Sequence, residues 1–154
     1  MKIDWSGERV GCALKRNIKR AIVLTLKNLN QDYKRFVLSV TFLNQDEMRE
    51  LNSRTRNIDK VTDVLSYPNF NMKPFDKIDT NDENNFMGKN IFLGDMALCL
   101  ERAKEQAEEY GHSLLKEVVK LVIHSTLHLM GFDHIEDDDY VVMNHEEEKI
   151  ASKF

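Results

Sequence analysis

The sequence predicts a single α+β domain, in which a small sheet packs against about five helices. A length of 154 residues suits one domain and is enough to bury a sizeable core. Hydrophobic periodicity indicates the order helix, strand, helix, strand, strand and then three further helices. No internal repeat divides the chain, so residues 1–154 are expected to fold as one unit.

The composition is that of a folded protein, with 42% hydrophobic, 8% aromatic and 31% charged residues. No apolar run reaches the roughly 18 residues of a membrane span, so no membrane partner is expected. Residues 1–10 lack the apolar region of a signal peptide, which argues against export. Cys12 and Cys99 lie far apart and fit no zinc or CxxC spacing, so they are predicted to be reduced thiols of a cytoplasmic protein.

The first predicted helix covers residues 9–30. Its apolar positions recur at three- and four-residue spacing, and they are Val10, Leu14, Ile18, Ala21, Ile22 and Leu26. The alternating, β-branched run at residues 36–42 predicts a strand. Asn44 is then placed to cap a short helix over residues 45–53.

A second strand is predicted over residues 61–67, ended by Pro68. Residues 69–90 form a loop that is long for a compact domain, where loops above roughly 12–15 residues are usually functional or mobile. The segment 91–96 reads as a third strand.

Three helices complete the prediction. The first, over residues 98–110, is charged and ends at Gly111. The second, over residues 114–130, is strongly apolar and ends at Gly131. The third covers residues 137–152, and its initial acidic run suits a helix N-terminus better than a second metal site.

Three histidines fall within eleven residues, at positions 124, 128 and 134. His124 and His128 are four residues apart on the apolar helix, so their imidazoles project from one face. Gly131 can adopt a left-handed conformation and turn the chain so that His134 faces the same point. Three imidazoles around one point are typical of a zinc site with an open position, although such sites also take nickel, copper or iron. The sequence therefore predicts a metal site at the end of the apolar helix.

The spacing HxxxHxxGxxH equals that of the metzincin metallopeptidases, which place a glutamate after the first histidine as general base. Ser125 stands at that position, and a serine cannot take the proton of a water molecule in that role. The peptidase interpretation therefore loses its main support.

Further motifs accompany the histidines. They are Leu51-Asn52, Arg56, the segment TDVLSYP at 62–68, Leu93-Gly94-Asp95 and the acidic residues after His134. Over roughly residues 36–150 this combination resembles the YbeY family of bacterial rRNA maturation factors, which are single-strand-specific endoribonucleases.

The resemblance implies a small mixed sheet, about four-stranded, with a cleft that leads to the metal. It implies His124, His128 and His134 as ligands of one zinc ion (Zn2+) per chain, and Arg56 as a functional residue at the RNA site. It also implies a role in 16S rRNA 3′-end maturation and ribosome quality control, with rRNA, small-subunit proteins and assembly factors as partners. The chain departs from the family at Ser125, where glycine is usual, and in its enlarged 69–90 loop.

The physical roles of the candidate residues agree with RNA hydrolysis. Arg56 could clamp a phosphate through two parallel hydrogen bonds. No general base is evident. Asp133 is interpreted as a partner of a metal ligand or a turn cap, and Asp63 as a residue that either orients Arg56 or caps a strand.

The net charge of −4 is unevenly distributed. Residues 1–60 hold 13 Lys and Arg against 7 Asp and Glu, whereas residues 61–154 hold 9 against 19. We expect the two parts to meet at a cleft, with RNA held on the basic side and cut at the metal. A basic face of the first helix is predicted to hold RNA backbone outside this cleft, through Lys15, Arg16, Lys19 and Arg20.

Three functions stay open on the sequence alone. A zinc-dependent endoribonuclease is favoured by the histidines and the family motifs. A ribosome-assembly binding factor with a mainly structural zinc is suggested by the missing general base. A metallopeptidase is suggested by the histidine spacing only.

Overall fold

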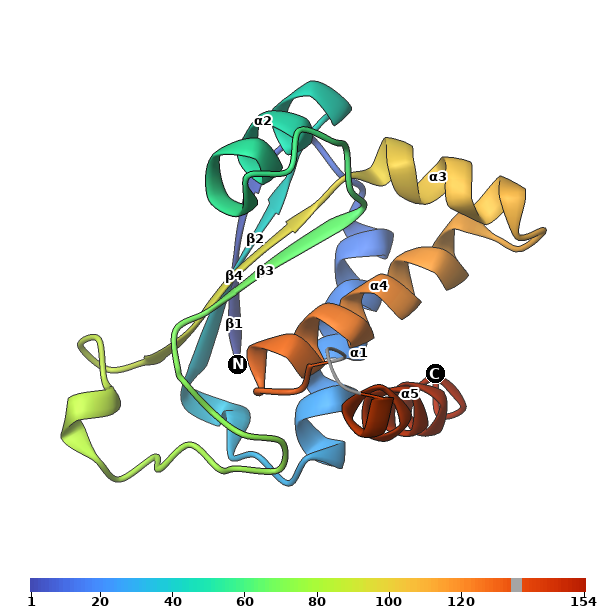
Figure 1. Ribbon diagram of the computed structural model, residues 1–154. Helices are drawn as coiled ribbons and strands as arrows, with labels where there is room; N and C mark the ends of the chain where they lie inside the picture. The colour runs from blue at the N-terminus through green and yellow to red at the C-terminus, as the bar shows by residue number, and fades with distance from the viewer. Residues whose placement is uncertain (134–136) are drawn as a thin grey trace.

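The sheet has four strands in the order β1-β2-β4-β3 and lies against a layer of helices (Figure 1). The computed structural model describes residues 1–133 and 137–154. The strands β1, β2 and β4 are parallel, and β3 is antiparallel to β4. Their bounds are Lys2–Gly7 for β1, Phe36–Phe42 for β2, Val64–Pro68 for β3 and Ile91–Leu98 for β4. The predicted α+β class with a small mixed sheet is confirmed.

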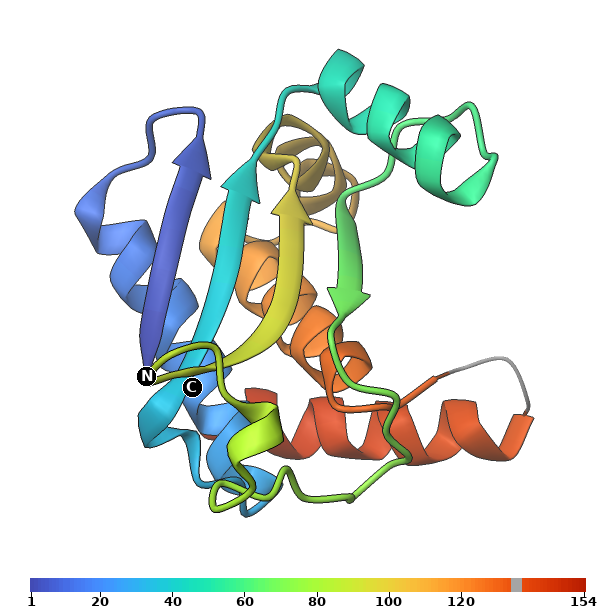
Figure 2. The same cartoon turned by 90° about the vertical axis from the view of Figure 1, so that its left-hand side faces the viewer.

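The described residues form five α-helices, in agreement with the prediction. Helices α1 and α4 lie behind the strands in Figure 2, which looks onto the opposite face of the sheet. The helices are α1 (Cys12–Asn28), α2 (Gln45–Arg56), α3 (Leu100–Glu109), α4 (Leu114–Leu129) and α5 (Asp137–Ala151). Within the described ranges, no helix combines the length and apolarity needed to cross a bilayer.

Strand β1 is the element that residue patterns alone did not predict. It is an edge strand, and only one of its six residues, Ile3, is buried. So exposed a strand has little hydrophobic alternation to detect. Its stability comes instead from distant partners, namely the parallel ladder with β2 and the stacking of Trp5 on Phe42, whose ring centroids are 5.9 Å apart.

Helix α2 begins as predicted and ends later than predicted. Asn44 and Glu47 form a capping box, in which each side chain bonds the backbone N–H of the other residue at 2.9 and 3.0 Å. The helix continues to Arg56 and stops because Asn57 adopts the left-handed conformation, with φ of 57°. The predicted end at Ser53 was therefore wrong, and Arg56 belongs to the last helical turn.

Two other boundaries differ from the prediction by three residues. Helix α1 begins at Cys12 because Gly11 is extended, with φ of −63° and ψ of 145°. Strand β3 begins at Val64, whose N–H is bonded by the Asp63 side chain rather than by a neighbouring strand.

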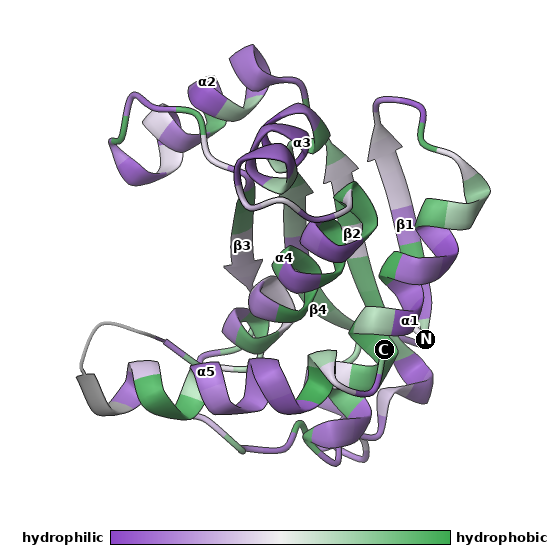
Figure 3. Ribbon diagram, turned by 90° about the vertical axis from the view of Figure 1, so that its right-hand side faces the viewer, coloured by the Kyte–Doolittle hydropathy of each residue, from purple (hydrophilic) through white to green (hydrophobic). Residues whose placement is uncertain are grey.

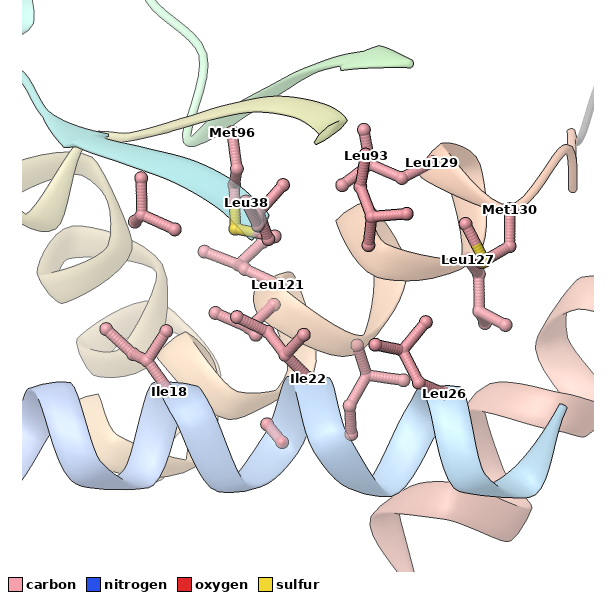
Figure 4. Packing of buried hydrophobic residues seen from close by; sticks show 14 of the residues in the cluster. Ile18, Ile22, Leu26, Leu38, Leu93, Met96, Leu121, Leu127, Leu129 and Met130 are labelled. Carbon is pink, nitrogen blue, oxygen red and sulfur yellow. The ribbon is translucent and has the colours of Figure 1, made fainter. Parts of the chain in front are cut away.

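Helix α4 lies at the centre of the core. Figure 4 shows Ile18, Ile22 and Leu26 of α1 facing α4, with strand residues such as Leu38 and Met96 on its other side. These five side chains are fully buried, and each such burial stabilises the fold by about 1.5–3 kcal/mol. Helix α4 is therefore held by α1 on one side and by the sheet on the other.

Colouring by hydropathy shows α2 and α3 as mainly hydrophilic and β2 and β4 as mainly hydrophobic (Figure 3).

The long segment between β3 and β4 is attached to the body of the domain. Gln31, which is buried, donates from Nε2 to the Asp76 carbonyl at 2.6 Å and accepts from the Ile78 N–H at 3.2 Å. Ile78 itself is buried in the core. These contacts hold the middle of the segment against the connection that follows α1.

The chain turns sharply after α4, as the glycine at position 131 predicts. Gly131 has a φ of +84°, and the Phe132 N–H bonds back to the Leu127 carbonyl at 3.1 Å. A Cβ atom at Gly131 would lie 2.3 Å from the Met72 carbonyl oxygen. Glycine is needed here both for the left-handed backbone and for the close approach of the 69–90 segment.

We expect Gly131→Ala to lower the free energy of unfolding by about 2–4 kcal/mol, because a methyl group adds both backbone strain and a steric clash. Urea unfolding followed by circular dichroism measures the loss. Gly88→Ala is the matched control, since Gly88 has a φ of +67° but open space around its Cβ position. Equal losses in the two variants would show that the close approach to Met72 is unimportant.

Candidate metal centre

Two of the three predicted metal ligands lie together at the C-terminal end of α4. The Nε2 atoms of His124 and His128 are 3.1 Å apart. Their rings are nearly perpendicular, with an angle of 82° between the planes and 4.6 Å between the centroids. The two imidazoles therefore converge through the same type of nitrogen, as the four-residue spacing predicts.

The opposite nitrogen of each ring has its own acceptor. His124 Nδ1 lies 2.6 Å from Glu147 Oε1, and His128 Nδ1 lies 2.9 Å from the Phe132 carbonyl oxygen. A carbonyl or a carboxylate accepts and does not donate, so this network assigns the proton of each neutral ring to Nδ1. Each Nε2 then carries a lone pair, which is the arrangement that metal-binding histidines adopt.

The donor geometry fits a tetrahedral cation. Two imidazole nitrogens that bind one zinc ion at about 2.0–2.1 Å lie about 3.3 Å from each other, close to the observed 3.1 Å. Two lone pairs at this distance repel unless a positive charge lies between them. Across residues 1–133 and 137–154, no group of three potential ligands comes together. His134, the third predicted ligand, lies outside the described residues.

Glu147 is a site residue that sequence reasoning missed. It lies on α5, its side chain is 18% exposed, and its carboxylate lies 2.6 Å from His124 Nδ1, from which it accepts a hydrogen bond. In the sequence it is one of three consecutive glutamates on a charged helix, so no local signal distinguishes it. Only the packing of α5 beside α4 brings it to the imidazole.

Ser125 joins α4 to the sheet. Its hydroxyl is fully buried and lies 2.7 Å from the hydroxyl of Ser66 on β3. Buried hydroxyl groups need such a partner, because an unpaired one is costly in free energy. A hydroxyl in this environment replaces neither the charge nor the basicity of the metzincin glutamate, in agreement with the sequence argument against a peptidase.

A groove of about 890 Å³ connects the histidine pair with Arg56. Arg56 donates from Nη2 to the Ser66 carbonyl at 3.1 Å, and its guanidinium carbon lies 5.9 Å from the centre of the Tyr67 ring. A guanidinium has several N–H donors, so one bond to the strand leaves others for a ligand. The structure thus brings Arg56 and both described histidines to one groove, as the expected cleft requires.

Asp63 and Asp133 also line this groove. The Asp63 carboxylate accepts from the Val64 N–H at 2.7 Å and from Gln106 Nε2 at 2.8 Å. Of its two predicted roles, these contacts favour the strand cap over the orientation of Arg56. Asp133 directly follows Phe132, whose carbonyl holds His128, and its role as a ligand partner or turn cap stays a prediction.

The basic face of α1 lies outside the groove. Lys15 Nζ is 5.3 Å from the centre of the Trp5 ring on β1, and the Arg20 guanidinium is 4.6 Å from the ring of Phe154. None of Lys15, Arg16, Lys19 and Arg20 belongs to the lining of the groove. The structure therefore joins Arg56, but not this helical face, to the histidines.

A second hollow of about 510 Å³ lies under α2. Its lining includes Leu43, Leu51 and Tyr67. Side chains alternate along a strand, and Ser66 faces α4, so Tyr67 faces the opposite side of the sheet. Of the two hollows, only the groove is lined by the two described histidines and Arg56.

Comparisons with known proteins give one consistent result. The family model described as endoribonuclease YbeY matches residues 5–154. A Clostridium botulinum (strain Langeland) protein named endoribonuclease YbeY is 44% identical over 154 residues, covering 95% of this chain and 91% of that protein. A Clostridium acetobutylicum protein of the same name is 42% identical over 148 residues, covering 92% and 88%. A solution structure of a Thermotoga maritima protein superposes with a TM-score of 0.62 at 28% identity, covering 97% of this chain and 87% of that one.

We expect Glu147→Gln to weaken zinc binding about 10- to 100-fold, because a neutral amide holds the Nδ1 proton of His124 less strongly than a carboxylate does. A competition titration against a chromophoric zinc chelator measures the affinity. Glu148→Gln is the control, since Glu148 is an exposed residue of the same helix. Equal affinities of the two variants would exclude this role of Glu147.

Proposed function

The chain belongs to the YbeY family of endoribonucleases, hydrolases that act on RNA, and from this we propose that it cuts single-stranded precursor 16S rRNA with one bound zinc ion. The observation that carries the proposal is the common groove of Arg56, His124 and His128. Hydrolysis of a phosphodiester requires positive charge at the scissile phosphate and an activated nucleophile. Both requirements can be met along this groove.

The histidines supply the metal-binding part of the site. His124 and His128, together with His134, would hold the zinc ion, whose chemistry is that of a Lewis acid for the phosphate and for water. Glu147 and the Phe132 carbonyl keep the protons of His124 and His128 on Nδ1, so that the lone pair of each ring is on Nε2. The protonation of the two imidazoles is thus set by the chain itself before the ion binds.

Arg56 is proposed to stabilise the negative charge that builds up on the phosphate oxygens. Its bond to the Ser66 carbonyl orients the guanidinium along β3. A planar guanidinium can then donate two parallel hydrogen bonds to one phosphate. Orientation in advance lowers the entropy cost of placing this charge when the substrate binds.

The biological context follows from the family. We propose action in 16S rRNA 3′-end maturation and in ribosome quality control, in the cytoplasm, with the small subunit, its proteins and assembly factors as partners. The basic face of α1, formed by Lys15, Arg16, Lys19 and Arg20, supports an additional contact with rRNA backbone outside the groove.

We expect Arg56→Ala to lower kcat/KM for cleavage of single-stranded RNA about a hundredfold, because it removes a donor aimed at the transition state. Arg56→Lys should recover only part of the loss, since an ammonium group cannot make the paired contact. Arg54→Ala is the matched control, because Arg54 lies on the same helix and lines the other hollow. Zinc-loaded protein and a labelled precursor 16S rRNA fragment provide the assay.

The assembly-factor alternative makes a different prediction in the same experiment. It requires that zinc-loaded protein binds small subunits but cuts no RNA, and that Arg56→Ala processes precursor rRNA as the unaltered chain does. That combination of results would replace the proposed nuclease function with a binding function.

A further inference from the structure

The groove extends well beyond the histidine pair, and β3 shows its direction. Its lining follows the chain from Thr62 to Ser66 and includes Pro68, a path of about 20 Å for an extended backbone. At Ser66, nearer the Pro68 end of this path, lie Arg56 and Ser125, the neighbour of His124. The site described above therefore occupies one part of a longer channel.

The end of the groove before β3 is formed by α3. Gln106 bonds the Asp63 carboxylate at 2.8 Å, and Arg102, one helical turn earlier, lines the groove beside it. Lys60 lines the same end, and its carbonyl accepts from Asn52 Nδ2 at 2.8 Å. Two cationic residues, Lys60 and Arg102, therefore line the end of the groove that is away from the turn after α4.

Arg102 is held in place by a short chain of contacts. Its Nη1 lies 2.8 Å from Glu105 Oε2, and the other oxygen of Glu105 accepts from Gln45 Nε2 at 2.7 Å. The Arg102 side chain is nevertheless 36% exposed. The guanidinium is thus oriented by α2 and α3 while its remaining donors can reach a ligand.

The opposite end of the groove has a different character. Its lining comes from the segment after β3 and from the turn after α4, and it includes Phe70, Met72 and Phe132. Among the described lining residues, no lysine or arginine belongs to this end. A polyanion that follows the groove therefore meets positive charge on one side of the histidine pair only.

We propose that Lys60 and Arg102 form a second phosphate subsite, which binds a backbone phosphate of the same RNA strand to one side of the scissile phosphate. This inference rests on the proposed nuclease function and adds to it a direction and a minimum length of substrate. The strand must extend by several nucleotides toward α3, whereas nucleotides toward Phe70 and Met72 contribute little through their phosphates.

The test compares variants on RNA oligonucleotides shortened from either end. In the zinc-loaded full chain, Arg102→Ala and Lys60→Ala should each raise KM about tenfold, more than they change kcat. Each should also make the salt dependence of binding shallower by about one counterion. Lys104→Ala is the control, because Lys104 is an exposed residue of α3 that pairs with Glu108 and lies outside the groove.

Shortening the RNA provides a second, coupled readout. Removing nucleotides from the end of the RNA that lies toward α3 should weaken binding to the unaltered chain, whereas removing them from the other end should not. The loss should disappear in a Lys60→Ala, Arg102→Ala double variant. Fluorescence anisotropy of labelled oligonucleotides measures binding without cleavage, and circular dichroism verifies that α3 is intact. Equal losses from shortening either end, or an affinity of both single variants equal to that of Lys104→Ala, would overturn the subsite.

These outcomes are separate from those for the proposed function. A chain that binds RNA through Lys60 and Arg102 but never cuts it would retain the subsite and contradict the nuclease function. Normal cleavage by both variants would retain the nuclease function and contradict the subsite.

Discussion

The packing of α4 between the sheet and α1 is the constraint on which the geometry of the candidate site depends. Ten of its sixteen residues are buried, as expected of a helix that packs against neighbours on more than one side. Apolar contacts fix it on most sides, and the hydroxyl pair of Ser125 and Ser66 sets its position along β3. Because the core leaves α4 little freedom, His124 and His128 are held at a fixed place relative to Arg56.

Local features of the fold were predictable from the sequence, and contacts between distant segments were not. The capping box of α2 and the turn at Gly131 depend on neighbouring residues, so their signals lie within a few positions. Strand β1 depends on a ladder to β2, and its own residues carry almost no pattern. The placement of His124 and His128 on one face follows from helix geometry, whereas the orientation of their rings depends on the contacts of Nδ1 with Glu147 and the Phe132 carbonyl.

The same division applies to the candidate site. Arg56 was connected to the histidines by family motifs and not by spacing, because Arg56 on α2 and Ser125 on α4 both contact Ser66 of β3, a residue distant from each in the sequence. Glu147 could not be selected from a run of glutamates, since its role arises where α5 passes His124. The distribution of charge along the sequence also did not predict which cationic residues line the groove. Arg102 belongs to the acidic part of the sequence and lines the groove, whereas the basic face of α1 does not.

The contact between Glu147 and His124 has a consequence for folding as well as for chemistry. Helix α5 is otherwise attached through Met143, Ile150 and a polar cluster around Glu146 and Asn28. Thermodynamic linkage is reciprocal, so an ion that binds more tightly when Glu147 supports His124 strengthens the docking of α5 by the same free energy. If the proposed zinc ion binds, the stability of α5 therefore depends on whether the metal site is occupied. Chelation should increase its amide hydrogen exchange before the rest of the domain responds.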